Sequence, residues 1–108
     1  MITLDITMHV RARRRIELVQ TLNSLKESMA EHGLVVEIEQ SGDGDTFNLQ
    51  TSWQGIEQMR NALPHDDFKI LAGAIAALCT KHSIRINGEL IQEDLAKLTT
   101  LKINKIQF

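Results

Sequence analysis

The sequence predicts an α+β domain in which strands and helices share one core. Apolar residues alternate with polar ones over residues 2–10 and again over residues 47–53, which is the period of a strand with one buried face. Over residues 14–32 apolar residues recur every three or four positions, which is the period of an amphipathic helix. Both periods within 108 residues favour a mixed fold with a single hydrophobic core.

The first strand is expected at residues 2–10 and the first helix at residues 14–32. The odd face of the strand is polar and comprises Thr3, Asp5, Thr7 and His9. The apolar stripe of the helix comprises Ile16, Val19, Leu22, Leu25 and Met29, with Leu18 beside it. Gly33 after His32 predicts the end of the helix, because glycine readily takes the left-handed conformation of the C′ position.

Strands two and three are expected to form a hairpin. The second begins at Leu34, and the third covers residues 47–53. Residues 41–45 combine glycine with short side chains that accept hydrogen bonds, which is typical of a turn. In the third strand one face is apolar and the other carries amides and hydroxyls, so we expect one buried and one solvated face.

The second helix is expected to be bent or divided near Pro64. Apolar residues at helical spacing cover residues 54–63, and the stripe resumes at Phe68 after the proline. Asp66 and Asp67 favour a new helix start there, because the dipole stabilises carboxylates in a first turn.

A fourth short strand is expected after Thr80, where alternation leads to a turn at Asn87 and Gly88. Residues 1–88 would form the core domain and residues 89–108 a C-terminal extension. The first half of the extension has helical spacing, at Leu90, Ile91, Leu95 and Leu98. Its second half is more strand-like and could reach a partner subunit.

The predicted order β-α-β-β-α-β is that of the ferredoxin-like split βαβ fold. This fold has a four-stranded antiparallel sheet with both helices on one face. The other face is then uncovered, and the polar odd face of the first strand suits a wet or partly buried surface. We expect this face to pair with a second copy of the chain, because two-fold dimers are the commonest soluble assemblies.

The composition argues against several classes of protein. No segment approaches the roughly 18 apolar residues of a membrane span, and residues 1–10 lack the order of a secretory signal. A cytoplasmic location is therefore expected. The single Cys79 gives no disulfide framework, and four scattered histidines predict no metal site. A net charge of −2 gives no general attraction to nucleic acid.

A basic cluster of Arg11, Arg13, Arg14 and Arg15 lies at the predicted start of the first helix. Cations oppose the helix dipole there, so another interaction should compensate. Glu17, a partner subunit or an anionic ligand could supply it, and a solvated loop with local ion pairs is the simplest alternative. Because no aromatic residues are interleaved, the cluster does not predict a nucleic-acid site.

Three segments of the chain resemble one family. The first is residues 10–18, Val-Arg-Ala-Arg-Arg-Arg-Ile-Glu-Leu, and the second is residues 32–34, His-Gly-Leu. The third is Phe47-x-Leu49-x-Thr51-x-Trp53 followed by Phe68-Lys69-Ile70-Leu71. In order and spacing they resemble the antibiotic-biosynthesis monooxygenase-like proteins, a branch of the dimeric α/β-barrel superfamily. The resemblance covers residues 1–88 and implies a homodimer of ferredoxin-like subunits.

The resemblance also implies an activity. Some members deprotonate an acidic phenolic substrate whose carbanion reacts directly with dioxygen, without a metal or prosthetic group, and others degrade haem. For this chain it implies a cofactor-independent monooxygenase that acts on a small aromatic or quinone-like molecule. Such chemistry needs an apolar pocket, a proton acceptor and hydrogen-bond donors for the anion.

The implied pocket lies between the sheet and the second helix. Its lining would be Phe47, Leu49, Trp53, Phe68 and Leu71. Trp53 would add one N–H donor as a catalytic group, although a core role suits it equally. His65 is the candidate for proton transfer or a solvated turn residue, because Ala62 and Leu63 stand where the family often has a histidine.

The departures from the family leave a second hypothesis open. Leu49 stands four residues before Trp53, where oxygenase members would have an asparagine, and Asn48 should point to the opposite sheet face. The chain also contains no tyrosine. These features favour a non-catalytic dimeric module of the same fold, for small-molecule binding or assembly. A cavity at Trp53 that contains a polar side chain would favour the enzyme.

Overall fold

The structure is a computed structural model that describes residues 1–100. One antiparallel sheet has the strand order β2-β3-β1-β4-β5. The strands are β1 (Ile2–Val10), β2 (Val36–Gln40), β3 (Thr46–Trp53), β4 (Cys79–Ile86) and β5 (Glu89–Ile91). The helices are η1 (Ala12–Arg14), α1 (Arg15–Glu31), α2 (Ile56–Ala62), α3 (Asp66–Leu78) and α4 (Leu95–Thr100).

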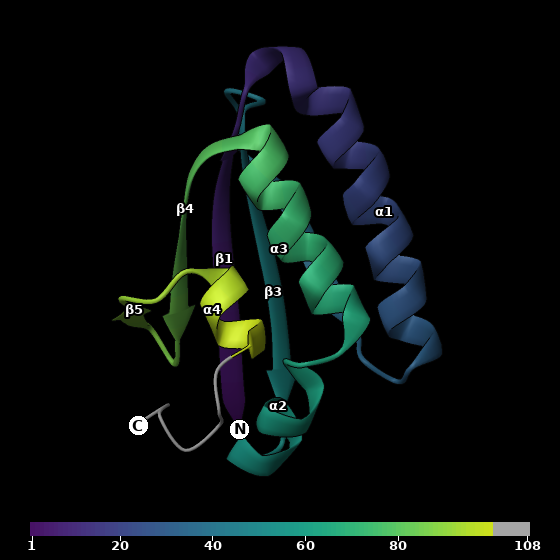
Figure 1. Cartoon of the computed structure of the whole chain (residues 1–108), viewed down its shortest axis with the longest axis vertical. Coiled ribbons are helices and arrows are strands. Elements are labelled where there is room, and N and C mark those ends of the chain that lie inside the picture. The colour runs from purple at the N-terminus through teal and green to yellow at the C-terminus, as the bar shows by residue number, and fades with distance from the viewer. Residues whose placement is uncertain (101–108) are drawn as a thin grey trace.

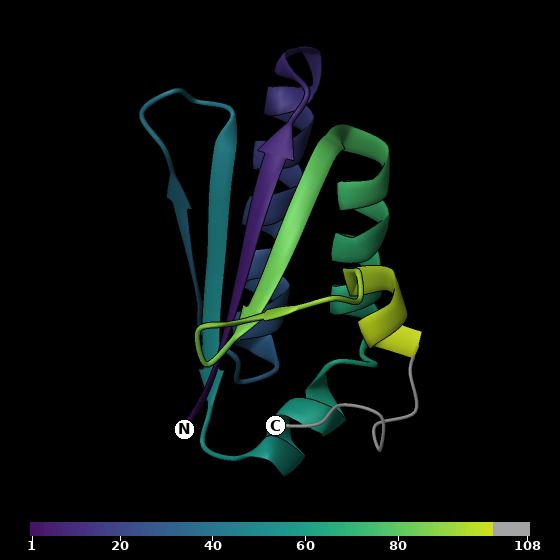
Figure 2. The same ribbon diagram turned by 90° about the vertical axis from the view of Figure 1, so that its left-hand side faces the viewer.

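The long helices α1 and α3 lie on the same face of the sheet (Figures 1 and 2). The predicted order β-α-β-β-α-β is confirmed, and the fold is of the ferredoxin-like α+β type. The predicted four-stranded sheet is corrected to a sheet of five strands within residues 1–100, because β5 pairs with β4 at its edge. No helix among residues 1–100 is long and apolar enough to cross a membrane.

The strand β5 overturns the helical prediction for Leu90 and Ile91. Asn87 (φ 51°) and Gly88 (φ 84°) form a two-residue turn that folds the next residues back along β4. The Asn-Gly pair therefore joins two strands instead of ending the sheet. The helical spacing of Leu95 and Leu98 is confirmed by α4, while the strand-like segment 101–108 lies outside the described residues.

The core fills the space between the sheet and the helices. The even residues of β1 face the helices and are buried, and Ile6 lies between Leu49 of β3 and Ile84 of β4 in the sheet. The buried stripe of α1 is Leu18, Leu22, Leu25 and Met29. Ile16, expected in this stripe, is 73% exposed, because it lies two positions from Leu18 and therefore on the opposite side of the helix.

The C-terminus of α1 ends in a Schellman motif. The Leu34 amide donates to the Met29 carbonyl at 2.9 Å and the Gly33 amide to the Ala30 carbonyl at 3.0 Å, with Gly33 at φ 82°. The predicted glycine stop is confirmed. Because Leu34 completes this motif, β2 begins two residues later than predicted, at Val36.

The helical segment is interrupted at Pro64, which lies between α2 and α3, as predicted. His65 takes an extended conformation at the N-cap of α3, and Asp66 and Asp67 occupy its first turn. At the other end of α3 the chain passes directly into β4 at Cys79, so the fourth strand is longer than predicted. The division gives α3 its own direction across the sheet, antiparallel to α1 (Figure 1).

The loop between β2 and β3 is closed by Asp43. Its carboxylate accepts hydrogen bonds from the Ser41 hydroxyl and from the amides of Asp45 (2.9 Å) and Thr46 (3.2 Å). The hydrogen bond from Ser41 is the main reason that the pKa of Asp43 lies below its usual value, and the amides add to this effect. The turn signal in residues 41–45 therefore predicted the correct structure.

Candidate functional site

The predicted pocket residues form part of the continuous core. Phe47, Leu49, Phe68 and Leu71 are at most 3% exposed and Trp53 is 8% exposed. Trp53, at the end of β3, contacts Phe68 of α3, with ring centroids 6.2 Å apart and a tilt of 43°. The structure thus brings the two aromatic residues together as the sequence suggested, in a filled space.

A small hollow lies next to this aromatic pair, where the C-terminal end of α1 meets the α2–α3 connection. Its volume is about 50 Å³. The lining residues are Met29, His32, Leu34, Ala62, His65, Asp67 and Phe68. We call it the His65 hollow. His65 and Phe68 are both predicted site residues, and here they border one space, whereas Trp53 lies behind Phe68.

Polar groups gather at the outer wall of the His65 hollow. His32 Nδ1 donates to the Ser28 carbonyl at 2.8 Å and lies 3.6 Å from Asp67 Oδ2. The Ser28 hydroxyl donates to Asp67 Oδ1 at 2.9 Å. The ring centroids of His32 and His65 are 6.3 Å apart. Two imidazoles and a carboxylate therefore face one apolar hollow, an arrangement that can accept and pass on a proton.

His32 was not predicted as a site residue, because in the sequence it only marks the end of the first helix, before Gly33. The predicted topology already implied that His32 would lie close to the start of α3. In a β-α-β-β-α-β fold the two helices run antiparallel on one face, so the end of α1 lies beside the start of α3. His32 is the C-cap residue of α1, and Asp67 lies in the first turn of α3, where the helix dipole stabilises its carboxylate.

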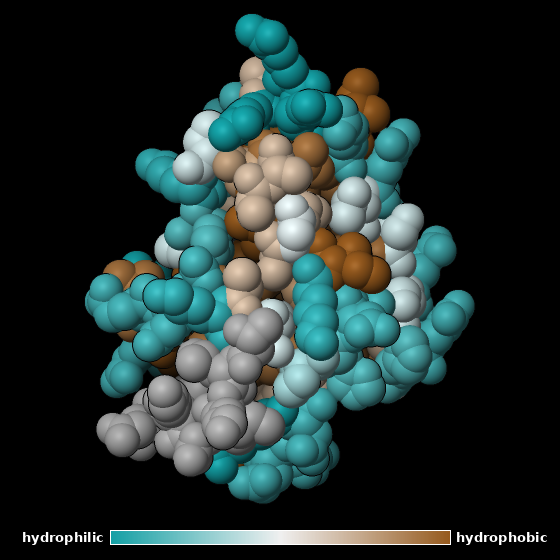
Figure 3. Space-filling view, viewed as in Figure 1, coloured by the Kyte–Doolittle hydropathy of each residue, from teal (hydrophilic) through white to brown (hydrophobic). Residues whose placement is uncertain are grey.

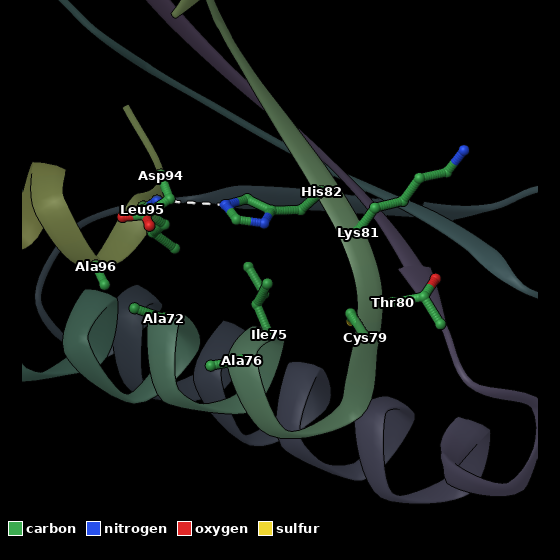
Figure 4. Close-up of a pocket in the computed structure, with 10 residues that line it drawn as sticks. All are labelled: Ala72, Ile75, Ala76, Cys79, Thr80, Lys81, His82, Asp94, Leu95 and Ala96. Atoms are coloured by element: carbon green, nitrogen blue, oxygen red, sulfur yellow. Dashed lines mark hydrogen bonds between the residues drawn. The ribbon is translucent and has the colours of Figure 1, made fainter. Parts of the chain in front are cut away.

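A second hollow, of about 250 Å³, lies between α3, β4 and α4 (Figure 4). Its polar groups already serve the fold. His82 Nε2 accepts the Leu95 amide at 3.3 Å, and Asp94 Oδ1 accepts the Lys97 amide at 2.8 Å. Burial raises the pKa of the Cys79 thiol, which keeps it protonated and unreactive at neutral pH. His82 and Asp94 therefore help to position α4.

The arginine cluster finds partners within the chain. Arg14 pairs with Glu17 at 2.7 Å, and Arg15 pairs with Asp45 of the β2–β3 loop. The backbone amide of Arg11 donates to the Leu78 carbonyl at 3.0 Å. In Figure 3 this upper end of the molecule is hydrophilic. Local ion pairs therefore compensate Arg14 and Arg15, which was the simplest of the alternatives.

The sheet face away from α1 and α3 is polar, and we call it the open face. Its residues are Glu37, Glu39, Thr46, Asn48, Gln50, Ser52, Thr3, Asp5, Thr7, His9, Lys81, Ser83 and Arg85. Thr7 Oγ1 donates to Asn48 Oδ1 at 3.1 Å, and Asn48 Nδ2 donates to Asp5 at 3.5 Å. Asn48 therefore lies on the face opposite Trp53, as predicted, and cannot replace a pocket asparagine.

Among residues 1–100 no three side chains of histidine, cysteine, aspartate or glutamate are grouped so that they could hold a metal ion. The His65 hollow brings two imidazoles and one carboxylate to one apolar space. The open face offers charges and hydrogen-bonding groups without an enclosed space.

Comparison with solved structures places the fold. An antibiotic biosynthesis monooxygenase superposes with a TM-score of 0.71 at 11% identity, covering 80% of this chain and 95% of its own. The chain has the fold of the antibiotic biosynthesis monooxygenases. A conserved protein from Methanosarcina mazei also superposes on this chain, with a TM-score of 0.71 at 16% identity over 82% of this chain and 91% of its own.

A variant of SnoaB, a cofactor-independent oxygenase from Streptomyces nogalater, also shares the monooxygenase fold. Its TM-score is 0.64 at 20% identity, over 78% of this chain and 89% of its own. No protein-family model and no curated protein sequence matches this chain. At these identities the likeness shows the fold, and activity has to be argued from the site.

Proposed function

We propose that this chain is a homodimeric protein that binds a small, single-ring aromatic molecule at the His65 hollow. The observation that carries the proposal is the convergence of His65 and Phe68 on one hollow, together with His32 and Asp67. Apolar walls with a few convergent polar groups are typical of small-molecule sites. A small-molecule ligand is also supported by the names of structures that share the fold, which include an antibiotic biosynthesis monooxygenase and a cofactor-independent oxygenase.

The size of the hollow restricts the ligand. Its inner wall is fixed, because Met29 and Phe68 are at most 2% exposed and belong to the core. Its outer wall can move, because His65 is exposed and the His32 side chain is 66% exposed. Outward rotation of these imidazoles would enlarge the present 50 Å³, and a single ring would need less of this enlargement than a three-ring anthrone.

The open face supports the homodimer. Hydrogen-bonded side chains at Thr7, Asn48 and Asp5 are already half-buried there, and neither α1 nor α3 lies over them. A second copy of the same face offers matching donors and acceptors, and aligned packing of two sheets is a common way to bury such surfaces.

Filling the hollow tests the binding site. Ala62→Leu is expected to weaken binding of a monocyclic quinol at least tenfold, measured by titration calorimetry, because the added side chain occupies the ligand space. Ala76→Leu, at the hollow between α3, β4 and α4, is the matched control and should leave binding unchanged. Equal affinity in both variants, or no binding by the wild type, would contradict the proposal.

A second candidate function is oxidation of the bound molecule by dioxygen without a cofactor. The imidazole of His65 beside His32 and Asp67 favours it, because a proton acceptor at the ligand is what this reaction needs. The substrate would lose a proton to His65, and its anion would add dioxygen. One oxygen atom would stay in the product as a carbonyl or hydroxyl, and the other would leave as water, with all electrons supplied by the substrate.

Oxygen uptake distinguishes this candidate from the non-catalytic dimeric module, which the filled core and Leu49 favour. Uptake with monocyclic quinols is expected to fall at least tenfold in His65→Gln, and also in Trp53→Ala if Trp53 supports Phe68 as the site requires. Lys69→Gln, exposed on α3, serves as the control. Binding without enzyme-dependent uptake would leave the non-catalytic module.

A further inference from the structure

A histidine interrupts the apolar, helix-facing side of β4. In the register of the sheet, Met8 of β1 pairs with His82. The next residue on the same side of β1, Val10, pairs with Cys79. Because the even residues of β1 face the helices, His82 and Cys79 face them too. They share this side although they are three positions apart, because a bulge at Thr80 interrupts the alternation of β4. Such bulges re-aim side chains and are common next to functional sites.

Only one nitrogen of the His82 ring takes part in the fold. Nε2 accepts the Leu95 amide at 3.3 Å. An amide nitrogen can only donate, so Nε2 carries no proton, and the neutral ring carries its proton on Nδ1. Within residues 1–100, Nδ1–H has no hydrogen-bond acceptor. The half-buried side chain therefore presents one free donor.

This donor belongs to the hollow of about 250 Å³ between α3, β4 and α4, which we call the His82 hollow. In Figure 4 the imidazole extends from β4 toward α4, and its second ring nitrogen lies on the side of Ile75. The apolar wall residues are mostly small: Ala72, Ile75, Ala76, Leu95 and Ala96. A concave space with apolar walls and a directed polar group is typical of a site for a small molecule.

The charges at the His82 hollow favour a neutral ligand. Lys81 borders the hollow but points away from it in Figure 4, on the other side of β4. Asp94 lies on the side of α4, where its Oδ1 accepts the Lys97 amide at 2.8 Å. The Asp94 carboxylate repels an anion, and the donor of His82 disfavours a cation that brings only donors. A neutral group that accepts a hydrogen bond avoids both penalties.

The volume of the hollow limits the size of this ligand. Pockets for drug-sized molecules measure about 300 to 1,000 Å³, so 250 Å³ suits a smaller molecule with one ring. The carbonyl oxygen of a ketone or lactone is a strong acceptor without charge. A phenolic oxygen is a weaker acceptor, because its lone pair is delocalised into the ring, so a quinol suits the His82 hollow less well.

We propose that the His82 hollow binds a small neutral carbonyl compound, a ketone or lactone of one ring. Its oxygen accepts the Nδ1–H of His82, and its hydrocarbon body packs against Ile75 and Leu95. The same tautomer of the ring serves the ligand and the Leu95 amide, so binding reinforces the contact that holds α4. The site shares no lining residue with the His65 hollow and does not depend on the function proposed there.

Three probes with the same six-membered ring test the chemistry by NMR titration of the wild type. Cyclohexanone is expected to shift the Nδ1–H resonance of His82 and the amide resonance of Leu95 in a saturable way. Cyclohexylammonium brings only donors, and cyclohexanecarboxylate meets Asp94, so each should bind at least tenfold more weakly. No saturable shift with cyclohexanone would refute the site. Equal or tighter binding of cyclohexylammonium would refute recognition by His82.

Two variants test the location of the site. Ala76→Leu fills the hollow, and His82→Gln removes the donor at Nδ1 while it keeps an oxygen that can accept the Leu95 amide. Each is expected to raise the Kd of cyclohexanone at least tenfold. Ala77→Leu, exposed on the same helix and outside the lining of the hollow, is the matched control and should leave the Kd unchanged.

The remaining outcomes separate this site from the His65 hollow. Ala62→Leu should leave cyclohexanone binding unchanged, and a loss there would place the ligand in the His65 hollow and refute the proposal. Wild-type affinity in Ala76→Leu, or an equal loss in Ala77→Leu, would also refute it. Circular dichroism and the amide resonance of Leu95 show whether each variant is folded with α4 in place.

Discussion

Leu49 shows how one residue separates this chain from the oxygenases that it resembles. It is fully buried, opposite Ile6 of β1 and beside Ile38 of β2. An apolar side chain suits this position, because both residues that pair with it, Ile6 and Ile38, are apolar. The asparagine implied by the family resemblance would have no hydrogen-bond partner among these side chains.

Leu49→Asn is therefore expected to lower the free energy of unfolding by about 3 to 5 kcal/mol. The loss combines about 2 kcal/mol of apolar burial with the cost of an unsatisfied buried amide. Gln50→Asn, on the open face, should change it by less than about 0.5 kcal/mol. Urea denaturation measures both. Wild-type stability of Leu49→Asn would indicate a polar space at this position and would strengthen the oxygenase hypothesis.

At the scale of elements, the two helix-associated glycines Gly33 and Gly73 play opposite roles. Gly33 has a positive φ of 82° and closes α1, and no atom would obstruct an added Cβ. Gly73 lies within α3, exposed, also with open space around it. The same substitution at the two positions therefore separates backbone conformation from steric contact.

Gly33→Ala is expected to lower the free energy of unfolding by about 1 to 2 kcal/mol, because an L-residue is strained in the left-handed region. Gly73→Ala should raise it by about 1 kcal/mol, because alanine is the better helix former. Thermal and urea unfolding would measure both changes. If both variants changed the free energy of unfolding in the same direction, the Schellman motif at the end of α1 would not limit stability.

Helix ends also decide where the candidate site forms. His32 and Asp67 are 35 positions apart in the chain, and they meet because α1 and α3 run antiparallel on one face. The break at Pro64 allows His65 to join them, since it leaves that residue extended at the start of α3. The hollow therefore depends on element ends, and not on the strand end that Trp53 marks.

At the scale of the whole molecule, a single layer of helices leaves one sheet face for a partner. If that partner is a second copy, unfolding must depend on protein concentration. Trp53 is the chain's single tryptophan. It lies at the end of β3 and contacts Phe68 of α3, so its fluorescence reports the loss of the shared core.

We expect light scattering at micromolar concentration to give about twice 12.2 kDa, and the urea midpoint to rise with protein concentration. Trp53 fluorescence and far-ultraviolet circular dichroism should follow the same transition, because one core joins sheet and helices. A midpoint independent of concentration, with a 12.2 kDa species, would contradict the homodimer. An earlier fluorescence transition would show that the Trp53 region unfolds separately.

The sequence by itself determined the order of strands and helices as far as β4, the end of α1 at Gly33, the break at Pro64 and the polar odd face of β1. Each depends on local preference or on the period of apolar residues, and both can be read along the chain. The contact between the Trp53 and Phe68 rings could be predicted as well, once the strand and the helix that carry them were placed on one face of the sheet.

Only the tertiary structure decided what these residues enclose. Packing fills the space around Trp53, Leu49 and Leu71, and the small hollow forms instead where His32 and His65 meet. The Asn-Gly turn added β5, because pairing with β4 outweighed helical spacing in a three-residue segment. Cavities and edge strands depend on contacts between distant segments, which no local period encodes.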